Sequence, residues 1–455
     1  MLELSDNSVT QFEIAFCSRN VPSSGFLYRM VWSVIRCLEV PAGETFNVSG
    51  DLKMKIAFLS KEYPPYGMNY AGALFFPKVV RAFAERGHQV HVITQAMGES
   101  SIDDDQGVVI HRIGPKAKSG SALSRMRYNV AAWKTLSRMA RDSQLDIIDA
   151  PVTFGEGLLP TLLKERPVVL YSFAFSNMFT RTGSYETRRE SLSLRVSSAL
   201  EDVSLRYADR VVANSPATYR YLISQKGLQP ERVEEIWEVR IDFGKWCFAQ
   251  SSIRAEYNIP VNAPMVLYVG WFQARKGIQI LSMAIAKVLE KHPDTVFVFV
   301  GRDPPSTSGA KSRKNALVQL ARRFGYLNNI RVIESFLPEE KLIKLYSSCD
   351  TFVFPSLSET FGWPIVEAIS CGRRVVATNV GIAPDLAKMG VKLRVVRPGD
   401  ASGLADAIVT SLSDTGNPMI YESENRRVVK QKFSFEEMMD RIFRLHEDVL
   451  ASPKR

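Results

Sequence analysis

The stretch SETFGWPIVEAISCGRRVVAT, residues 358–378, holds a short predicted helix, its start and stop signals, and two glutamates. It follows the apolar run DTFVFPS (350–356), which predicts a buried strand. Pro364 suits the first helical position and Gly372 the position past the helix end, so PIVEAISC predicts a short helix. A second apolar run, RRVVATN (373–379), follows directly. Short apolar strands separated by a helix predict neighbouring strands of a parallel sheet.

The same alternation of strands and helices begins at MKIAFLS (54–60) and continues along the chain. The other predicted strands lie at 89–94, 108–113, 145–150, 167–171, 209–215, 264–270, 295–301 and 329–334. A less regular stretch at 240–262 divides them into two sets. We therefore expect an α/β protein with two doubly wound, Rossmann-like domains that face a central cleft.

The predicted organisation has four parts. Residues 1–53 lack the strand and helix rhythm, so we expect a poorly ordered N-terminal extension without a role in the chemistry. An N-terminal domain at 54–243 and a C-terminal domain at 244–433 follow, and 434–455 form a final helix and tail. Two domains agree with a length of 455 residues, which exceeds that of one ordinary core.

Composition and cysteine usage indicate a globular enzyme in a reducing compartment. The chain is 45% hydrophobic and 23% charged, as folded enzymes are. Its five cysteines are odd in number and show no C-x-x-C spacing, which argues against structural disulfides and zinc. Since no run reaches the ~20 apolar residues of a spanning helix, we expect a cytoplasmic protein.

The net charge of +10 is concentrated between residues 111 and 141, which hold eight Lys or Arg and no acid. Basic motifs with interleaved aromatic residues, as RNA- and DNA-binding modules have, do not occur in the sequence. We therefore expect no nucleic-acid partner. Three alternatives stay open for this segment: peripheral contact with the anionic inner face of a membrane, a phosphate-bearing acceptor, or an ordinary solvated helix.

The loops that follow strands carry the candidate binding residues, because ligands of open α/β sheets lie at the carboxyl ends of the strands. Gly67 and Gly72 follow the first strand, where glycine lets a backbone approach a ligand. A simple turn explains these glycines equally well. G-x-G-x-x-G after a leading strand and G-x-x-x-x-G-K-[ST] are both absent, which excludes a dinucleotide fingerprint and a P-loop.

Arg275 and Lys276 lie after another strand, immediately before Gly277 and a predicted helix. Two cations beside the start of a helix favour a diphosphate, since the free N–H groups and the helix dipole also attract anions. The alternative is a pair of solvated surface cations.

Glu359 lies in the loop after the strand at 350–356, and Glu367 lies about one turn inside the helix that follows. Both can face one pocket, with the backbone N–H groups of Phe361 and Gly362 between them. Carboxylates accept hydrogen bonds from hydroxyls, so Glu367 could hold a ribose and Glu359 a hexose. Alternatively, Glu367 complements the helix dipole and Glu359 points to water.

The E-x7-E pair with its Phe-Gly-x-Pro, followed by EAISCGRRVVAT, resembles the signature of the retaining glycosyltransferases of family four, which have the GT-B fold. Further segments resemble that family in the same order: MKIAFLSKEYPPYGMNYAG (54–72), AFAERGHQVHVIT (82–94), ADRVVANS (208–215), YVGWFQARKG (268–277) and RPGDASGLADAI (397–408). The resemblance covers roughly residues 54–450.

This resemblance implies a nucleotide-sugar donor held between the two domains, chiefly by the second. Glu359 would contact the donor sugar, Glu367 the ribose, and Arg275 with Lys276 the diphosphate. Backbone groups of Phe361 and Gly362, and of the loop from Gly67 to Gly72, would approach the donor. A glycan or lipid-linked acceptor would enter over the first domain, and neither a metal nor another cofactor is expected.

The implied activity is transfer of a hexose, with retention, in polysaccharide or cell-envelope biosynthesis. Three departures from the family pattern leave an alternative open. Trp271 stands where the family has arginine, Ser172 where it has histidine, and VGIAPDL (380–386) where it has Gly-Gly-x-Pro-Glu. The alternative is a catalytically idle GT-B subunit that binds a nucleotide-sugar. An epimerase of the same architecture is disfavoured, because none of the five histidines lies in these loops.

Overall fold

The computed structural model describes residues 53–66, 71–114, 122–177, 188–304, 312–335, 337–414 and 418–452. All of these residues belong to one compact unit, residues 48–455. Apart from Lys53, the predicted extension at 1–53 lies outside the described residues, and so does Gly67.

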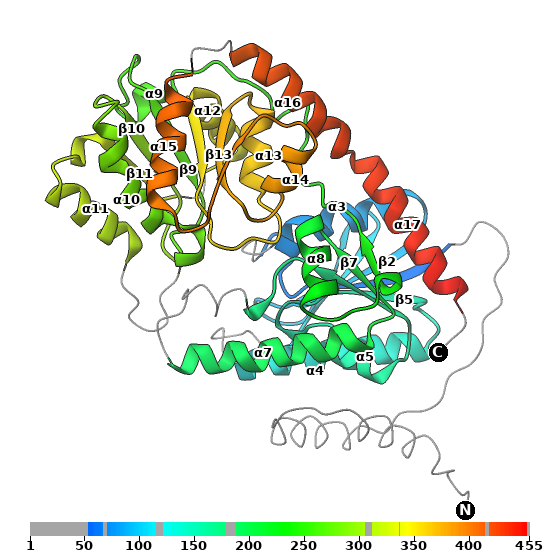
Figure 1. Cartoon of the computed structure of the whole chain (residues 1–455). Coiled ribbons are helices and arrows are strands. Elements are labelled where there is room, and N and C mark those ends of the chain that lie inside the picture. Colours follow the sequence, from blue (N-terminus) through cyan, green and yellow to red (C-terminus); the bar gives the residue numbers. More distant parts are fainter. Residues whose placement is uncertain are drawn as a thin grey trace, which may run out of the picture. The chain divides into compact units, whose positions relative to one another are not determined.

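The first sheet has eight strands in the order β3-β4-β2-β1-β5-β6-β7-β8. Three of them, β2, β5 and β7, are labelled in Figure 1. The strands are β1 (Lys55–Leu59), β2 (Gln89–Gln95), β3 (Ser101–Asp105), β4 (Val108–Ile113), β5 (Ile147–Pro151), β6 (Val168–Ser172), β7 (Arg210–Ala213) and β8 (Val233–Glu235). All neighbouring pairs are parallel except β3 and β4, and β1 pairs through Ile56 with both Val90 and Ile147. We call this sheet and its helices the first lobe.

Helices cover both faces of this sheet. They are α3 (Ala71–Glu85), α4 (Ala122–Arg141), α5 (Leu158–Leu163), α7 (Arg188–Tyr207) and α8 (Pro216–Ser224). On one face, Phe76 and Phe83 of α3 pack against Phe58 of β1. On the other face, Tyr128 of α4 is buried with Ile93 of β2. Alternate residues of each strand therefore point into two separate cores, as a doubly wound sheet requires.

The second sheet has six parallel strands in the order β11-β10-β9-β12-β13-β14. They are β9 (Met265–Val269), β10 (Val296–Val300), β11 (Ile330–Ile333), β12 (Thr351–Phe354), β13 (Arg374–Thr378) and β14 (Arg394–Val396). The surrounding helices are α10 (Ile278–Leu289), α11 (Arg313–Arg323), α12 (Glu339–Ser348), α13 (Trp363–Ser370), α14 (Ala383–Lys388) and α15 (Ala401–Leu412). We call this sheet and its helices the second lobe. The predicted fold class is confirmed.

The helix of the opening stretch, α13, begins one residue earlier than expected. Gly362 is its N-cap residue with φ +118°, and Pro364 is its second residue instead of its first. A helix start tolerates proline at either position, because the N–H groups of the first turn have no partner within the helix. Gly372 follows the helix with φ +72°, as its place in the sequence predicts.

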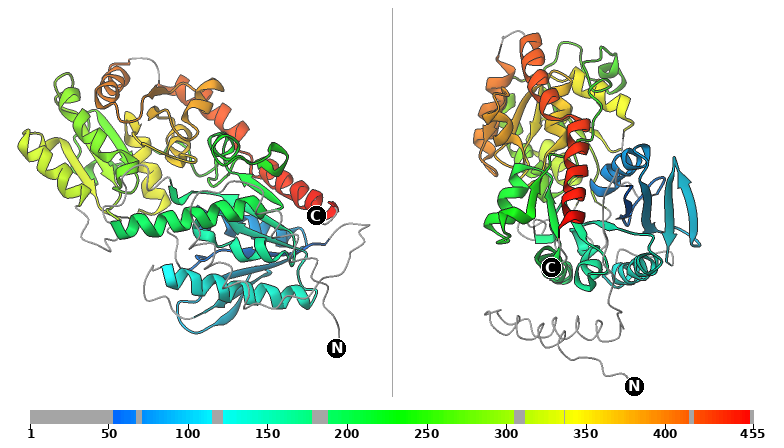
Figure 2. Two further views of the ribbon diagram at one scale, coloured as in Figure 1. Left: turned by 60° about the horizontal axis from the view of Figure 1, so that its bottom comes forward. Right: turned by 90° about the vertical axis from the view of Figure 1, so that its right-hand side faces the viewer.

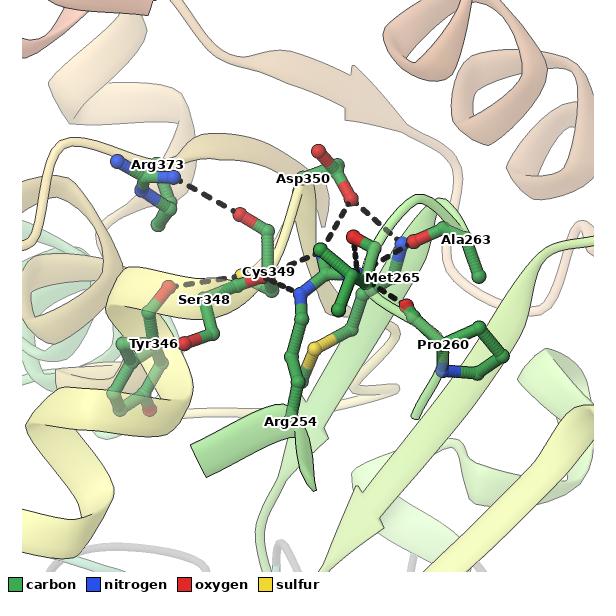
Figure 3. A network of polar contacts seen from close by, with 10 residues as sticks. Arg254, Pro260, Ala263, Met265, Tyr346, Ser348, Cys349, Asp350 and Arg373 are labelled. Carbon is green, nitrogen blue, oxygen red and sulfur yellow. Dashed lines mark hydrogen bonds and ion pairs between the residues drawn. The ribbon is translucent and has the colours of Figure 1, made fainter. Parts of the chain in front are cut away.

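Polar contacts at the amino ends of β9 and β12 fix the two strands that carry the candidate loops (Figure 3). Asp350 accepts hydrogen bonds from the Met265 N–H at 2.7 Å and from Arg254 Nη2 at 3.1 Å. Arg254, on the short helix α9 (Ile253–Glu256), also donates to the carbonyls of Ser348 at 2.8 Å and Ala263 at 2.6 Å. Because the two amino ends are tied together, the loops at the two carboxyl ends emerge side by side.

The last two helices, α16 (Pro418–Lys432) and α17 (Phe435–Ala451), follow the second lobe in the chain, and α17 packs on the first (Figure 2). Phe443 of α17 contacts Phe83 with ring centroids 4.4 Å apart. His446 Nε2 lies 3.0 Å from both carboxylate oxygens of Asp149 on β5, and both side chains are fully buried. The C-terminal helix therefore contributes to the core of the first lobe.

Candidate active site

The loop after β9 is pressed against the loop after β12. Gly277 has φ +70°, and a Cβ placed there would lie 1.8 Å from the carbonyl oxygen of Pro355. The Leu357 N–H donates to the Arg275 carbonyl at 2.7 Å. Only glycine tolerates so close an approach. Gly277 therefore places Arg275 and Lys276 beside the loop after β12.

Arg275, Lys276 and Glu359, the three predicted catalytic residues, lie together. Arg275 Nη1 donates to Glu359 Oε1 at 2.9 Å, and Lys276 Nζ lies 2.5 Å from the same oxygen. The Glu359 side chain is 8% exposed, and each cation is 16% exposed. Burial alone would raise the pKa of Glu359, but the charges of Lys276 and Arg275 lower it below its ordinary value. The carboxylate is therefore ionised, and the three residues form a charged triad.

A cavity of about 430 Å³ lies beside Glu359. Its lining comes from both lobes: Phe175, Thr218 and Tyr221 from the first, and Ser358, Glu359 and Gly381 from the second. Clefts of this size at the carboxyl ends of parallel strands suit small-molecule ligands. Of the three triad residues, only Glu359 is part of this lining, so Glu359 borders a space that a substrate can enter.

Thr360, next to Glu359, joins the two lobes at this cavity. Its hydroxyl donates to the Phe173 carbonyl at 2.7 Å, and its own carbonyl accepts a hydrogen bond from Ser215 Oγ. Arg220 on α8 forms a two-pronged ion pair with Asp385 on α14, at 2.9 and 2.8 Å. Sequence patterns gave no signal for these contacts, because hydroxyls and charges that meet across lobes follow no local spacing.

Phe361 and Gly362 form the turn that leads from the loop into α13. The Phe361 side chain is 3% exposed and stacks on Trp363, with ring centroids 4.7 Å apart. Its carbonyl accepts from the Ile382 N–H at 2.8 Å, and a Cβ on Gly381 would lie 1.9 Å from that oxygen. The phenyl ring therefore belongs to the core, and a ligand can meet this turn only through its backbone.

Glu367 lies inside α13 and has a partner of its own. Tyr346 donates its hydroxyl to Glu367 Oε2 at 2.7 Å. Burial raises the pKa of Glu367 to about 7, against the opposing effects of Tyr346 and Arg240. Glu367 is not part of the lining of the 430 Å³ cavity. The prediction that it shares a pocket with Glu359 stays a prediction.

Of the two glycines predicted to approach the donor from the first lobe, one is among the described residues. Gly72 is buried as the second residue of α3, whereas Gly67 lies outside the described residues. The approach of this loop to a ligand therefore stays a prediction.

The structure describes the neighbours of Trp271 and Ser172, two of the residues that depart from the family pattern. The Arg302 guanidinium lies 5.1 Å from the centre of the Trp271 ring. Ser172 is fully buried at the end of β6, and its Oγ has no hydrogen-bond partner among the described residues. A cation thus still lies beside residue 271, although the side chain at that position is apolar.

Among the described residues, no three His, Cys, Asp or Glu side chains gather as a metal site would require. No helix there combines the length and the apolar character needed to cross a bilayer. The expectation that no metal takes part stays a prediction.

Two family models match the chain. Residues 78–237 match the model described as Glycosyltransferase Family 4, and residues 249–431 match the one described as Glycosyl transferases group 1. The first match lies in the first lobe, and the second begins before β9 and covers the second lobe and most of α16.

Curated relatives are glycosyltransferases and a synthase. The D-inositol 3-phosphate glycosyltransferase of Nocardia farcinica is 29% identical over 208 residues, 46% of each chain. The chain spans about half the length of this relative and of similar ones. The alpha-maltose-1-phosphate synthase of Mycolicibacterium smegmatis is 24% identical over 413 residues, which cover 88% of this chain and all of the relative.

Solved structures share the two-lobed fold. Sucrose-phosphate synthase from Thermosynechococcus elongatus superposes with a TM-score of 0.71 at 22% identity, over 88% of this chain and 99% of that one. Anabaena HepE in complex with UDP-glucose superposes with a TM-score of 0.66 at 22% identity, over 87% of this chain and all of that one.

Proposed function

Because the chain belongs to the glycosyltransferases described by these two models, with the GT-B fold, we propose that it transfers a hexose with retention from a nucleotide-sugar. The proposed acceptor is a glycan or a lipid-linked sugar of polysaccharide or cell-envelope biosynthesis. The proposed location is the cytoplasm, with peripheral contact to the inner face of the membrane.

The observation that carries this proposal is the triad of Arg275, Lys276 and Glu359, in which Glu359 lines a cavity between the lobes. When the anomeric bond breaks, negative charge develops on the leaving diphosphate. Fixed cations aimed at that charge lower the barrier, and they need no reorganisation as the reaction proceeds. The UDP-glucose held by the similar fold of HepE supports a nucleotide-sugar donor.

Glu359 is proposed to orient the sugar. A carboxylate that already accepts from two cations is a weak nucleophile, but it can still accept hydrogen bonds from sugar hydroxyls. In the proposed step, the bond from the anomeric carbon to the diphosphate breaks while the acceptor hydroxyl attacks on the same face. The departing phosphate oxygen takes the hydroxyl proton, so no protein base is needed.

The second candidate is a catalytically idle subunit that binds a nucleotide-sugar. Trp271 and the unpartnered Ser172 favour it, because each replaces a polar or charged side chain that the family pattern has. The triad suits both candidates, because cations beside a diphosphate strengthen binding and also stabilise the charge of the leaving group. Only a transfer assay therefore separates the two.

Transfer from labelled UDP-, GDP- and ADP-hexoses to an acceptor extract tests the proposal. The wild-type chain should transfer label with one of these donors, and Glu359→Ala and Lys276→Ala should reduce transfer at least about a hundredfold. A wild-type chain that binds a nucleotide-sugar but transfers nothing would support the idle subunit. A chain that neither binds nor transfers would exclude both candidates.

A further inference from the structure

The linker between the lobes, residues 236–264 between β8 and β9, carries a buried ion pair, Glu238 with Arg240. Arg240 Nε donates to Glu238 Oε1, and the Glu238 side chain is 1% exposed. Asn214 Nδ2 donates to the other carboxylate oxygen at 3.2 Å. Burial of a carboxylate is costly unless it is paired and hydrogen-bonded. Glu238 therefore fixes the position of the Arg240 side chain.

Only one edge of the Arg240 guanidinium is occupied. The bond to Glu238 uses Nε, and Nη1 and Nη2 have no hydrogen-bond acceptor among the described residues. The side chain is nevertheless only 17% exposed. Its Cζ lies 5.9 Å from the centre of the Trp363 ring, at the start of α13. The guanidinium of a largely buried arginine thus lies beside the residue where α13 begins.

This region also contains the candidate donor-site residues. Burial and Tyr346 have the largest effects on the pKa of Glu367, and the charge of Arg240 comes next. The charge of Arg240 also contributes to the lowered pKa of Lys276. Arg240, from the linker, therefore lies within electrostatic reach of both the triad and the proposed ribose-binding glutamate.

The cations of this region share few carboxylate oxygens. Arg275 and Lys276 both contact the same oxygen, Glu359 Oε1, and Arg240 contacts Glu238 through Nε only. Like charges held in a partly buried region repel each other, and an anion between them relieves that repulsion. The arrangement therefore suits a ligand that carries several negative charges.

We propose that Arg240 is a donor-binding residue, which grips the phosphates of the nucleotide-sugar through Nη1 and Nη2 while Glu238 holds it in place. This inference rests on the proposed function. The planar fork of arginine matches two phosphate oxygens at once, a geometry that lysine cannot reproduce. Because Arg240 lies on the linker and Lys276 on the second lobe, the phosphates would join the two.

The network behind Arg240 leads to the triad. Asn214, which holds Glu238, accepts a hydrogen bond from Thr218 Oγ1 at 2.8 Å. Thr218 and the adjacent Ser215 both contact the Thr360 carbonyl, next to Glu359. Arg240 and Glu359 are therefore positioned by one continuous set of buried polar side chains.

Calorimetric titration with a nucleoside diphosphate tests this inference. The probe is whichever of UDP, GDP and ADP raises the melting temperature of the wild-type chain most. The main variant is Glu238→Gln/Arg240→Gln, which removes both charges and leaves no unpaired buried carboxylate. It should bind the diphosphate at least about tenfold more weakly. Its affinity should also depend less steeply on NaCl, which loss of a purely structural pair would not cause.

Arg240→Lys and Lys291→Gln complete the design. Arg240→Lys keeps the charge but loses the fork, so its affinity should lie between those of the wild type and the double variant. Lys291 is exposed on the second lobe, and its loss should change nothing. If the folded double variant binds the diphosphate with an affinity within twofold of wild type, the proposed role of Arg240 is wrong. The proposed function would still stand in that case. A wild-type chain that binds none of the three diphosphates would overturn the proposed function as well.

Discussion

Lys276 Nζ and Glu359 Oε1 lie 2.5 Å apart, although the two residues belong to loops after different strands, β9 and β12. The contact exists because those strands are neighbours in the parallel sheet and because Gly277 lets the two loops touch. The proposed catalytic charge arrangement is therefore a property of the sheet order and of one glycine, as much as of the charged residues themselves.

Gly277→Ala should displace the cation loop. The added Cβ would meet the Pro355 carbonyl at 1.8 Å in a backbone with φ +70°. We expect the free energy of unfolding to fall by about 2–4 kcal/mol and sugar transfer to be largely lost. Urea denaturation and transfer assays measure the two effects.

Gly325→Ala is the matched control for this change. Gly325 has φ +75°, but a Cβ there would have no heavy atom within 4 Å. It should cost only the backbone strain, about 1 kcal/mol, and leave transfer intact. Equal losses in the two variants would show that strain, and not the loop contact, determines the effect.

Glu367→Gln should change how stability depends on pH. Burial raises the pKa of Glu367 to about 7 from its ordinary value of 4.5, so the folded chain keeps a proton that the unfolded chain has lost. Stability should therefore decline as pH rises from about 4.5 to 7, by at most about 3 kcal/mol. The variant should lose this decline. A difference in stability between wild type and variant that stays constant from pH 4.5 to 7 would contradict the assignment.

His446 should stabilise the docking of α17 as an imidazolium. Its Nδ1 faces the Ile442 carbonyl at 2.7 Å and its Nε2 faces the Asp149 carboxylate, so both ring nitrogens meet acceptors and both must carry a proton. Burial opposes the charge, but Asp149 raises the pKa of His446 above 6.5. The stabilisation is full below pH 6.5 and should be lost as pH rises through the pKa of the folded state.

Single and double variants isolate this pair. His446→Gln leaves Asp149 buried without a counter-charge and should cost about 3–5 kcal/mol of unfolding free energy at pH 6. Asp149→Asn/His446→Gln should cost less than the single change. Chemical denaturation at several pH values measures the free energy that the pair contributes. A contribution found only at alkaline pH would contradict a protonated His446.

The basic helix α4 should bind anionic membranes. Four of its cations are exposed, and their spacing places them on one helical face: Arg127, Lys134, Arg138 and Arg141. Each cation near an anionic surface contributes about 1 kcal/mol. Replacement of all four by Gln should therefore abolish sedimentation with phosphatidylserine vesicles, while transfer to a soluble acceptor persists.

A variant with four exposed second-lobe cations changed to Gln controls for net charge: Lys291, Arg322, Arg323 and Lys388. It should still sediment with the vesicles. Equal losses in both variants would indicate a general charge effect, and vesicle binding by neither the wild type nor the control would favour the solvated-helix alternative.

The sequence allowed the fold and the candidate residues Lys276 and Glu359 to be predicted, because both depend on local patterns. Apolar runs between helices predicted the central strands, and the rule that ligands lie at the carboxyl ends of parallel strands selected Lys276 and Glu359. The ion pair between these two residues was not predicted, and the edge strands β3, β8 and β14 were missed. Strand β3, SIDDD, is almost entirely exposed and pairs only through its backbone with β4, so it has no apolar pattern to detect.

Contacts between distant segments could not be predicted either. Arg240 lies in the linker, which has no strand or helix rhythm, and its position depends on Glu238 and Asn214. The pairing of Arg220 with Asp385 joins residues that are 165 positions apart. Such contacts follow from how complete elements pack together, and no short segment contains that information.

A crystal structure with the bound nucleoside diphosphate tests the proposed donor site. We expect phosphate oxygens within hydrogen-bond distance of Lys276 Nζ and the Arg275 guanidinium, with Glu359 facing the space that the donor sugar would occupy. A nucleotide bound elsewhere, with the ion pairs of Lys276 and Arg275 to Glu359 unchanged and no phosphate beside them, would contradict it.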